Sequence, residues 1–424
     1  MIQLNSSFKK LISSSGVNFI FRIFGLGTSF LTTVLITRFF GVGTFGDYSL
    51  VFALSQIIAL LFTLGIPNTL IKIIGNNNFT FSQAKKLLIK GLKGSLILSI
   101  IPILFFYFGS TFLSESIFHN TQLVNYFLIV SISIPLFIVH EIFLYFLIAT
   151  QNFKKYNFFM FVIPNILLIL FLFLFFTLDK NNYFTFIAFS LAIFITVLLE
   201  AFTIFELNPK KEAISITTVA LIKTASPLLF SGLFMYLLNY TNVIMLGIMS
   251  NDKQVGIYNI AYKIGSVGFL VIVSVSTIIT PKMAELYGKG NLDQLKKLTH
   301  NSTRLIAFLS LPIVLCLILF SNYILSFWGT EVSSGETTLI IVSIGVLFSA
   351  MAGNVDQILN MTENQNIFRN ITIFSFFVNL LLSYLLIPKY NIEGAATASL
   401  ITNILINLLC LYYIKKKLGF YTLF

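Results

Sequence analysis

The sequence predicts an all-α integral membrane protein with about twelve membrane-spanning helices in two lobes of six. Hydrophobic residues make up 57% of the 424 residues and charged residues only 10%. A soluble domain carries roughly a quarter charged residues. In addition, the basic residues gather in alternate connections, and the two halves of the chain resemble each other. This composition excludes a soluble enzyme.

Apolar stretches long enough to cross a bilayer follow one another along the whole chain. The first six are expected at 12–36, 46–71, 92–113, 123–149, 157–177 and 184–206. The second six are expected at 224–249, 256–280, 303–325, 338–361, 370–387 and 394–414. Arg22 interrupts the first stretch and no small-residue cleavage site follows it, so we expect a retained span and not a signal peptide. Cys316 and Cys410 lie in apolar runs, and they predict neither a disulfide nor a metal site.

The positive charge follows a pattern of sides. Most of the 27 Lys and Arg residues lie in alternate connections or near the two ends of the chain, as at Lys85, Lys154, Lys296 and Lys415. Because cytoplasmic connections are enriched in basic residues, both termini are predicted to be cytoplasmic. The net charge of +12 is therefore a topology signal, and no nucleic-acid partner is expected.

The two halves of the sequence carry an internal repeat. Four matches occur in the same order at nearly one spacing: GDY at 46–48 with GIY at 256–258, QAKKL at 83–87 with QLKKL at 294–298, PI at 102–103 with PI at 312–313, and Asn165 with Asn379. Six helices per half is an even number, so we expect lobes 1–210 and 211–424, related by a pseudo-two-fold axis along the membrane normal. Such bundles commonly hold a substrate between their lobes, which favours a transporter.

Three basic residues lie at or near membrane depth, where charge is costly and usually faces an interior cavity. Arg22 lies near the middle of the first stretch, Arg38 at its end, and Lys263 in the eighth. They predict a cationic cavity that binds an anionic substrate. For Arg22 and Lys263, structural pairing with a carboxylate is an alternative, as is snorkelling for Lys263.

Acidic groups and a histidine form a second set of candidates. His140 and Glu141 lie in the fourth stretch and Asp356 at the equivalent place in the tenth. They are candidates for proton or sodium coupling, because histidine changes its charge near neutral pH. Simple pairing between helices is the alternative. Glu200 is close enough to the end of its stretch to be expected in solvent.

Polar amides at helix depth include Asn18, Asn239 and Asn242. They are interpreted as joints between helices, with a polar cavity lining suited to a sugar as the alternative. The sequence GVGTFG at 41–46 fits a dinucleotide fingerprint, but no acidic residue follows at the required distance. We interpret it as a tight turn in which glycine supplies unusual backbone angles.

Three segments of the chain resemble the polysaccharide-transport branch of the multidrug/oligosaccharidyl-lipid/polysaccharide (MOP) exporter superfamily, specifically the O-antigen flippases. These are TRFFGVGTFGDY at 37–48 with LGIP at 64–67, VGIYNIAYK at 255–263, and NLLLSYLLIP at 379–388 with GAATA at 394–398. The twelve expected helices and the length agree with this family over essentially the whole chain. Asn242 departs from the family, since relatives often carry an acidic residue in the seventh helix.

The resemblance implies a flippase that moves undecaprenyl-diphosphate-linked oligosaccharide repeat units from the cytoplasmic to the outer leaflet of the bacterial inner membrane by alternating access. It implies as partners the lipid-linked oligosaccharide, the lipid bilayer, and a polysaccharide polymerase with its chain-length machinery. No cofactor is implied.

The sequence leaves two other functions open. A cation-coupled multidrug exporter of the same superfamily should have an acidic, aromatic cavity, whereas the basic residues at membrane depth here roughly balance Glu141 and Asp356. A membrane repeat-unit polymerase needs polar residues gathered in sizeable outer loops, and the outer loops here are short.

Overall fold

The structure is a computed structural model that describes residues 6–76, 79–178, 181–205 and 218–422. Every regular element within these ranges is a helix, which confirms the all-α class. The chain divides into two compact units. We call Gly16–Tyr236 the N-terminal unit, and Leu237–Phe424 with the first residues of the chain the C-terminal unit.

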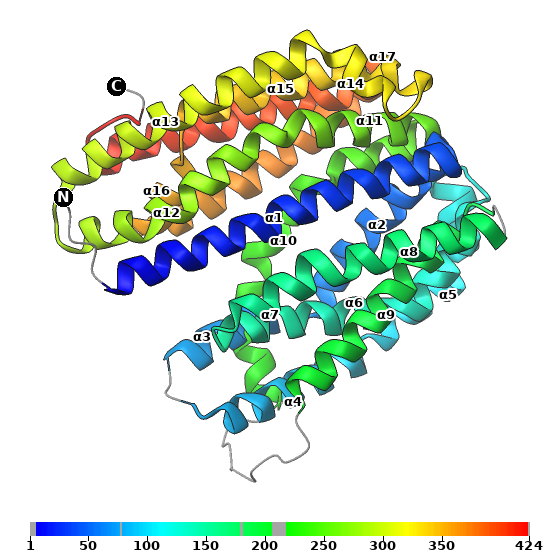
Figure 1. Cartoon of the computed structure of the whole chain (residues 1–424), viewed down its shortest axis with the longest axis horizontal. Coiled ribbons are helices and arrows are strands. Elements are labelled where there is room, and N and C mark those ends of the chain that lie inside the picture. Colours follow the sequence, from blue (N-terminus) through cyan, green and yellow to red (C-terminus); the bar gives the residue numbers. More distant parts are fainter. Residues whose placement is uncertain (1–5, 77–78, 179–180, 206–217, 423–424) are drawn as a thin grey trace. The chain divides into compact units, whose positions relative to one another are not determined.

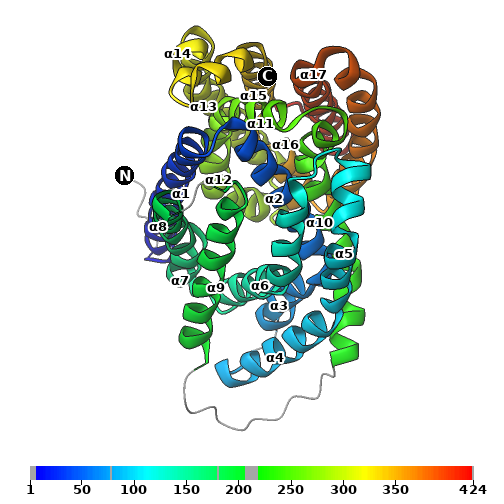
Figure 2. The ribbon, with the colours of Figure 1, turned by 90° about the vertical axis from the view of Figure 1, so that its right-hand side faces the viewer.

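The N-terminal unit is built around α6, a long apolar helix (Figure 1). Its helices are α1 (Ser6–Phe39) from Gly16 on, α2 (Val42–Phe62), α3 (Ile66–Asn76), α4 (Phe81–Leu98), α5 (Ile100–Thr111), α6 (Leu123–Ala149), α7 (Phe153–Asn157), α8 (Ile163–Leu178), α9 (Phe184–Ile204) and the first part of α10 (Thr218–Met249). α6 packs against α2, α3, α4, α5 and α9, and Figure 2 shows it between α9 and α5. A polar side chain on the inner side of α6 is therefore surrounded by protein.

Helix breaks divide several of the expected apolar stretches. The stretch expected at 46–71 forms two helices, because Leu64 and Gly65 adopt positive φ angles of 56° and 73° between α2 and α3. Pro67 then lies in the first turn of α3, where its missing N–H has no helical partner to lose. Gly41, with φ 98°, directly precedes α2, so the expected tight turn is confined to this residue. The expectation that it extends over 41–46 was wrong, because residues 42–46 already form the start of α2.

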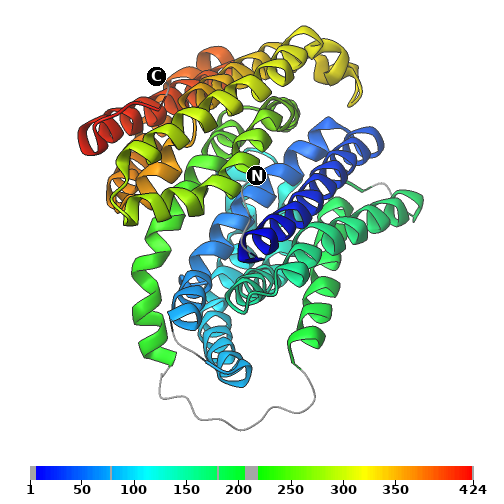
Figure 3. The ribbon, with the colours of Figure 1, turned by 60° about the vertical axis from the view of Figure 1, so that its left-hand side comes forward.

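The C-terminal unit contains the rest of α10 and seven further helices, with colours from green to red in Figure 3. These are α11 (Asp252–Gly265), α12 (Phe269–Gly288), α13 (Leu292–Leu319), α14 (Ser321–Ser326), α15 (Glu336–Ala352), α16 (Val355–Met361) and α17 (Gln365–Leu418). α15 packs against α11, α13 and α17. Short π-helical segments (Phe112–Ile117 and Phe158–Val162) and 3-10 segments (Ser266–Gly268 and Thr330–Gly335) complete the described helices of the two units.

α17 is a hairpin of two helical arms and not one straight helix. The backbone leaves helical geometry at Asn391, with φ 50° and ψ −124°. Thr402 on the second arm donates to Oδ1 of Asn379 on the first at 3.3 Å. The two arms correspond to the stretches expected at 370–387 and 394–414.

The internal repeat has a structural counterpart at the start of two helices. Before α4, the backbone N–H of Gln83 donates to Oγ1 of Thr80 at 3.3 Å, and the Gln83 side chain accepts from the Thr80 N–H at 3.1 Å. Before α13, the N–H of Gln294 donates to Oδ1 of Asn291 at 3.1 Å. Such caps satisfy N–H groups that lack helical partners. The repeated Gln-x-Lys-Lys-Leu segment is thus a capped helix start in each unit.

The described residues contain ten segments long and apolar enough to cross a membrane. Both arms of α17 are counted as one of these ten, and α10 contributes a shorter apolar helix, Leu233–Met249. The chain is therefore a multi-pass membrane protein. The number twelve and the lobes 1–210 and 211–424 stay predictions, and the expected boundary falls outside the described residues.

Candidate functional site

A small cavity with a few polar groups in its lining lies inside the N-terminal unit. Its volume open to water is ≈ 30 Å³, and about 10–15 Å³ is enough for one water molecule. The cavity is lined by Gln56, Ala59, Leu60, Phe137, His140, Glu141, Phe189, Ile193 and Tyr236. Apolar side chains from α2, α6 and α9 form most of this lining, so the polar groups among them lie in a low-dielectric surrounding.

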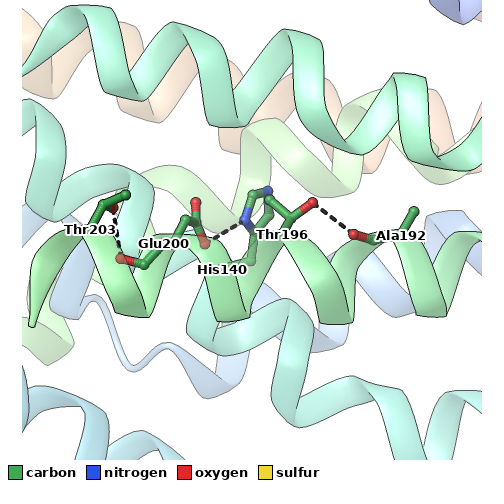
Figure 4. A network of polar contacts seen from close by, with 5 residues as sticks. All are labelled: His140, Ala192, Thr196, Glu200 and Thr203. Carbon is green, nitrogen blue, oxygen red and sulfur yellow. Dashed lines mark hydrogen bonds and ion pairs between the residues drawn. The ribbon is translucent and has the colours of Figure 1, made fainter.

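His140 and Glu200 form a buried pair between α6 and α9 (Figure 4). Nδ1 of His140 lies 3.1 Å from Oε2 of Glu200, and their side chains are 13% and 0% exposed. A carboxylate removed from water is costly unless it is paired and hydrogen-bonded. The pairing explains why Glu200 is tolerated in the interior of this unit.

The rest of α9 gives Glu200 little further help. The hydroxyls of Thr196 and Thr203 donate to backbone carbonyls of their own helix, those of Ala192 and Glu200 (Figure 4). Oε1 of Glu200 is buried and has no hydrogen-bond partner in the part of the chain that the structure describes. His140 is therefore the hydrogen-bond partner of the Glu200 carboxyl group within the described residues.

Glu141 follows His140 on α6 and also lines the cavity. It interacts electrostatically with His140, and with Tyr145 and Tyr156. Within the described ranges, no three His, Cys, Asp or Glu side chains are arranged to hold a metal ion. The cavity thus has two carboxylates and one imidazole beside it without a metal-binding arrangement.

Arg22 and Arg38 lie on α1, as expected, but in different surroundings. Arg22 is half-buried and Arg38, in the last turn, is exposed. Arg22 interacts electrostatically with Tyr156. It forms no ion pair with a carboxylate of the described residues. The cationic cavity expected around Arg22, Arg38 and Lys263 stays a prediction.

The structure describes the surroundings of two of the three amide candidates, and they differ. Asn242 is buried in the C-terminal unit, where its Nδ2 donates to the Ser399 hydroxyl and its Oδ1 accepts from Ser383 at 2.7 Å. Asn239, one turn earlier on α10, is exposed. The side chain of Asn18 lies outside the described residues. Asn242 therefore acts as a joint between α10 and both arms of α17.

The two remaining candidates lie in the C-terminal unit. Lys263 is half-buried in the last turn of α11. Asp356 is half-buried in the first turn of α16 and accepts from Nε2 of Gln357 at 2.9 Å. Glu141 lies in an uninterrupted helix, whereas Asp356 follows a helix break at Gly353, where φ is 79°. The two carboxylates that the repeat relates are therefore in different local structures.

Of the expected site residues, His140 and Glu141 lie together at the cavity, and Glu200, the partner of His140, is an addition from the structure. The expectation that Glu200 is in solvent was wrong, because its side chain is 0% exposed. The sequence offers one signal, an acidic residue inside an otherwise apolar stretch. The pairing itself joins residues that are far apart in the sequence.

The fold and this cavity define a multi-pass α-helical membrane protein with a polar, ionisable interior site. Residues 9–287 match the family of polysaccharide biosynthesis proteins, and residues 227–385 match the MatE family. Since the first match covers well over half of the sequence, the chain belongs to the polysaccharide biosynthesis protein family.

Curated relatives match shorter regions. The capsular polysaccharide biosynthesis protein CapF of Staphylococcus aureus is 28% identical over 193 residues, 45% of this chain and 48% of CapF. The probable low-salt glycan biosynthesis flippase Agl15 of Haloferax volcanii is 22% identical over 182 residues, 43% of this chain and 39% of Agl15. The probable flippase AglR of the same organism is 25% identical over 181 residues, 42% of this chain and 38% of AglR. The matches therefore span half or less of each relative.

Solved structures match nearly the whole chain. The lipid II flippase MurJ in an inward closed conformation has a TM-score of 0.79 at 18% identity, over 95% of this chain and 87% of MurJ. An inward-facing multidrug resistance MATE family transporter of the MOP superfamily has a TM-score of 0.78 at 16% identity, over 93% of this chain and 94% of the transporter. These likenesses show that the chain has the MOP transporter fold.

Proposed function

We propose that the protein is a flippase that moves undecaprenyl-diphosphate-linked oligosaccharide repeat units from the cytoplasmic to the outer leaflet of the bacterial inner membrane by alternating access. The main support for this proposal is the family match over residues 9–287, in a chain with the MOP transporter fold. CapF is named for capsular polysaccharide biosynthesis, and Agl15 and AglR are named probable flippases. The names of CapF and Agl15 refer to polysaccharide or glycan biosynthesis, and MurJ is named a lipid II flippase, which supports a lipid-linked saccharide as the cargo.

The cationic residues fit a cargo with two phosphates. Arg22 is half-buried and forms no ion pair within the described residues, and a guanidinium matches the geometry of phosphate oxygens. We propose that Arg22 binds the diphosphate, and that Arg38 and Lys263 add positive charge along its path. Asn18 and Asn239 are proposed polar contacts for the sugars, whereas the bonds of Asn242 favour a structural role.

The lipid bilayer is the immediate partner of the exposed apolar surface, which includes Phe108 and Phe202. We propose a bacterial inner membrane location with both termini in the cytoplasm, as the distribution of Lys and Arg predicts. A polysaccharide polymerase and its chain-length machinery are proposed partners, because a repeat unit delivered to the outer leaflet has to be joined to others there.

Deletion of the gene tests the function. We expect loss of the surface polysaccharide, with lipid-linked repeat units accumulating on the cytoplasmic face of the inner membrane. Protease-free spheroplasts and inverted vesicles, probed with a lectin for the repeat unit, measure its amount on each face. Unchanged surface glycan together with new sensitivity to cationic drugs would replace the flippase by a multidrug exporter.

A further inference from the structure

In the His140–Glu200 pair, Glu200 is enclosed by protein, whereas His140 borders the cavity. Glu200 is 0% exposed, and Nδ1 of His140 faces it at 3.1 Å. The imidazole also lines the cavity, and its Nε2 has no hydrogen-bond partner among the residues that the structure describes. A ring in this position can exchange a proton with cavity water through Nε2 while Nδ1 stays bonded to Glu200.

Charge balance favours one proton on this pair. Imidazolium beside carboxylate, and neutral imidazole beside carboxylic acid, both have zero net charge. Removal of the proton leaves Glu200 as a buried carboxylate, with Oε1 lacking any partner in the described ranges. An uncompensated buried charge is strongly unfavourable, so release of the proton has to be linked to another event in the protein.

The surroundings of the pair favour a proton over a metal ion. Within the described residues, the ionisable groups that act on His140 are Glu200 and Glu141. Gln56 of α2 and Tyr236 of α10 are the other polar residues of the cavity lining. No three acidic, His or Cys side chains converge as metal ligands in these ranges, and hard cations prefer several oxygen ligands over an imidazole nitrogen.

We propose that the His140–Glu200 pair is a proton-binding site of the N-terminal unit, filled from the cavity beside Glu141, and that this proton is exchanged as the cargo is flipped. In the loading step, hydronium in the cavity gives its proton to Nε2 of His140, which leaves water and an imidazolium–carboxylate pair. Release is the reverse reaction. The second half of the proposal rests on the proposed function.

Nuclear magnetic resonance of histidine nitrogens tests the site without any transport assay. The chain has three histidines, so 15N-histidine-labelled protein in nanodiscs gives few signals, and His119→Asn and His300→Gln assign those of the other two. We expect the His140 nitrogens to change between imidazolium and imidazole with pH, and the midpoint to move in Glu200→Gln. A His140 signal that ignores pH, or that ignores Glu200→Gln, overturns the proton site.

Reconstitution into liposomes tests the coupling. The probe is a fluorescent undecaprenyl-diphosphate disaccharide, and its distribution between leaflets is read by chemical quenching. If one proton moves per cargo, a gradient of about one pH unit shifts the leaflet ratio by up to about tenfold, because each unit is 1.36 kcal/mol. We expect this shift in the wild type and in His119→Asn, a control outside the cavity. His140→Gln/Glu200→Gln should hold the ratio near one.

The double variant keeps the protein foldable, because two amides can hydrogen-bond where the charged pair stood. If it does not elute as a folded protein, Glu200→Gln alone takes its place. A wild type that flips the probe with no response to the gradient overturns the coupling and leaves the flippase intact. A wild type that does not flip the probe, while His140 titrates, overturns the cargo and leaves the proton site standing.

Discussion

At the scale of single residues, Asn242 shows how a polar group at membrane depth is satisfied. Its amide donates to Ser399 and accepts from Ser383, and Ser399 lies 3.3 Å from the Tyr258 hydroxyl. In the hydrocarbon core no water is present to hydrogen-bond an unpaired amide, so leaving Asn242 unpaired would be costly. These bonds therefore hold α10 to α17. Asn242 thus completes a set of hydrogen bonds that joins α10, α11 and both arms of α17.

Replacement of Asn242 should therefore destabilise the fold. Asn242→Leu removes two interhelical hydrogen bonds, which are worth about 0.6–1.7 kcal/mol each in membrane proteins. We expect a lower thermal unfolding midpoint in detergent. The exposed Asn239→Leu, one turn away on the same helix, is the matched control and should leave the midpoint unchanged. Equal effects of the two variants would contradict a structural role for Asn242.

Arg22 gives the residue-scale prediction for transport. Arg22→Ala should reduce flipping strongly at normal protein levels, since a half-buried cation with no carboxylate partner in the described part of the chain is removed. Arg22→Lys should recover more activity than Arg22→Gln, because it keeps the charge though not the planar fork of the guanidinium. Surface glycan measured after complementation of the deletion checks this order, and full activity of Arg22→Ala would refute the cationic role.

Among the residues of the candidate site, the sequence predicts His140 and Glu141 but not the buried Glu200. The sequence identifies His140 and Glu141 as ionisable residues in an apolar stretch, and that much follows from composition. Glu200 looks like an acid near a helix end, only four residues before Ile204 closes α9. Its burial depends on how α9 packs against α6, and such packing is not encoded in either stretch alone.

At the scale of elements, Gly65 sets the break between α2 and α3. Its φ of 73° suits glycine, and a Cβ there would lie 2.9 Å from the backbone N of Leu229 and also overlap the Ala225 carbonyl. Close approach of α10 therefore requires the absence of a side chain at this position.

Gly65→Ala should destabilise the N-terminal unit. The unfavourable φ alone costs roughly 1–2 kcal/mol, and overlap with the backbone of α10 adds to it because backbone cannot move aside as a side chain can. We expect a clear drop in the thermal unfolding midpoint. Gly27→Ala is the control, since a Cβ there meets nothing within 4 Å and alanine favours a helix by up to about 1 kcal/mol. A tolerated Gly65→Ala would show that α10 does not pack closely on this break.

Helix bounds and helix breaks differ in how far they can be predicted. α6 spans Leu123–Ala149 and α9 spans Phe184–Ile204, close to the expected 123–149 and 184–206, because polar residues limit each apolar stretch. The break at Leu64 and Gly65 lies within a continuous apolar stretch, so hydropathy carries no sign of it. The positive φ angles of Leu64 and Gly65 form the break, and the backbone of α10 leaves no room for a side chain at Gly65.

At the scale of the whole molecule, the internal repeat and the distribution of Lys and Arg together predict which ends of the helices lie on the same side of the membrane. The capped starts of α4 and α13 are equivalent in the repeat, and both are followed by pairs of lysines. Lys253 and Glu331 form an ion pair at 3.0 Å within the C-terminal unit, which brings the start of α11 and the loop before α15 to the same side. If the halves are parallel, as the repeat predicts, the lysine-rich ends of both units lie on one side of the membrane, and the distribution of Lys and Arg predicts that this side is the cytoplasm.

Cysteine labelling tests this topology in one experiment. In a chain whose Cys316 and Cys410 are replaced by serine, single cysteines are placed at the exposed Lys154, Lys296 and Glu331. A membrane-impermeant maleimide should label Glu331→Cys in intact spheroplasts, and Lys154→Cys and Lys296→Cys only after the membrane is opened, because basic connections stay in the cytoplasm. Labelling of Lys154→Cys and Lys296→Cys from opposite sides would mean that the halves are inverted, and alternating access would then need a different symmetry axis.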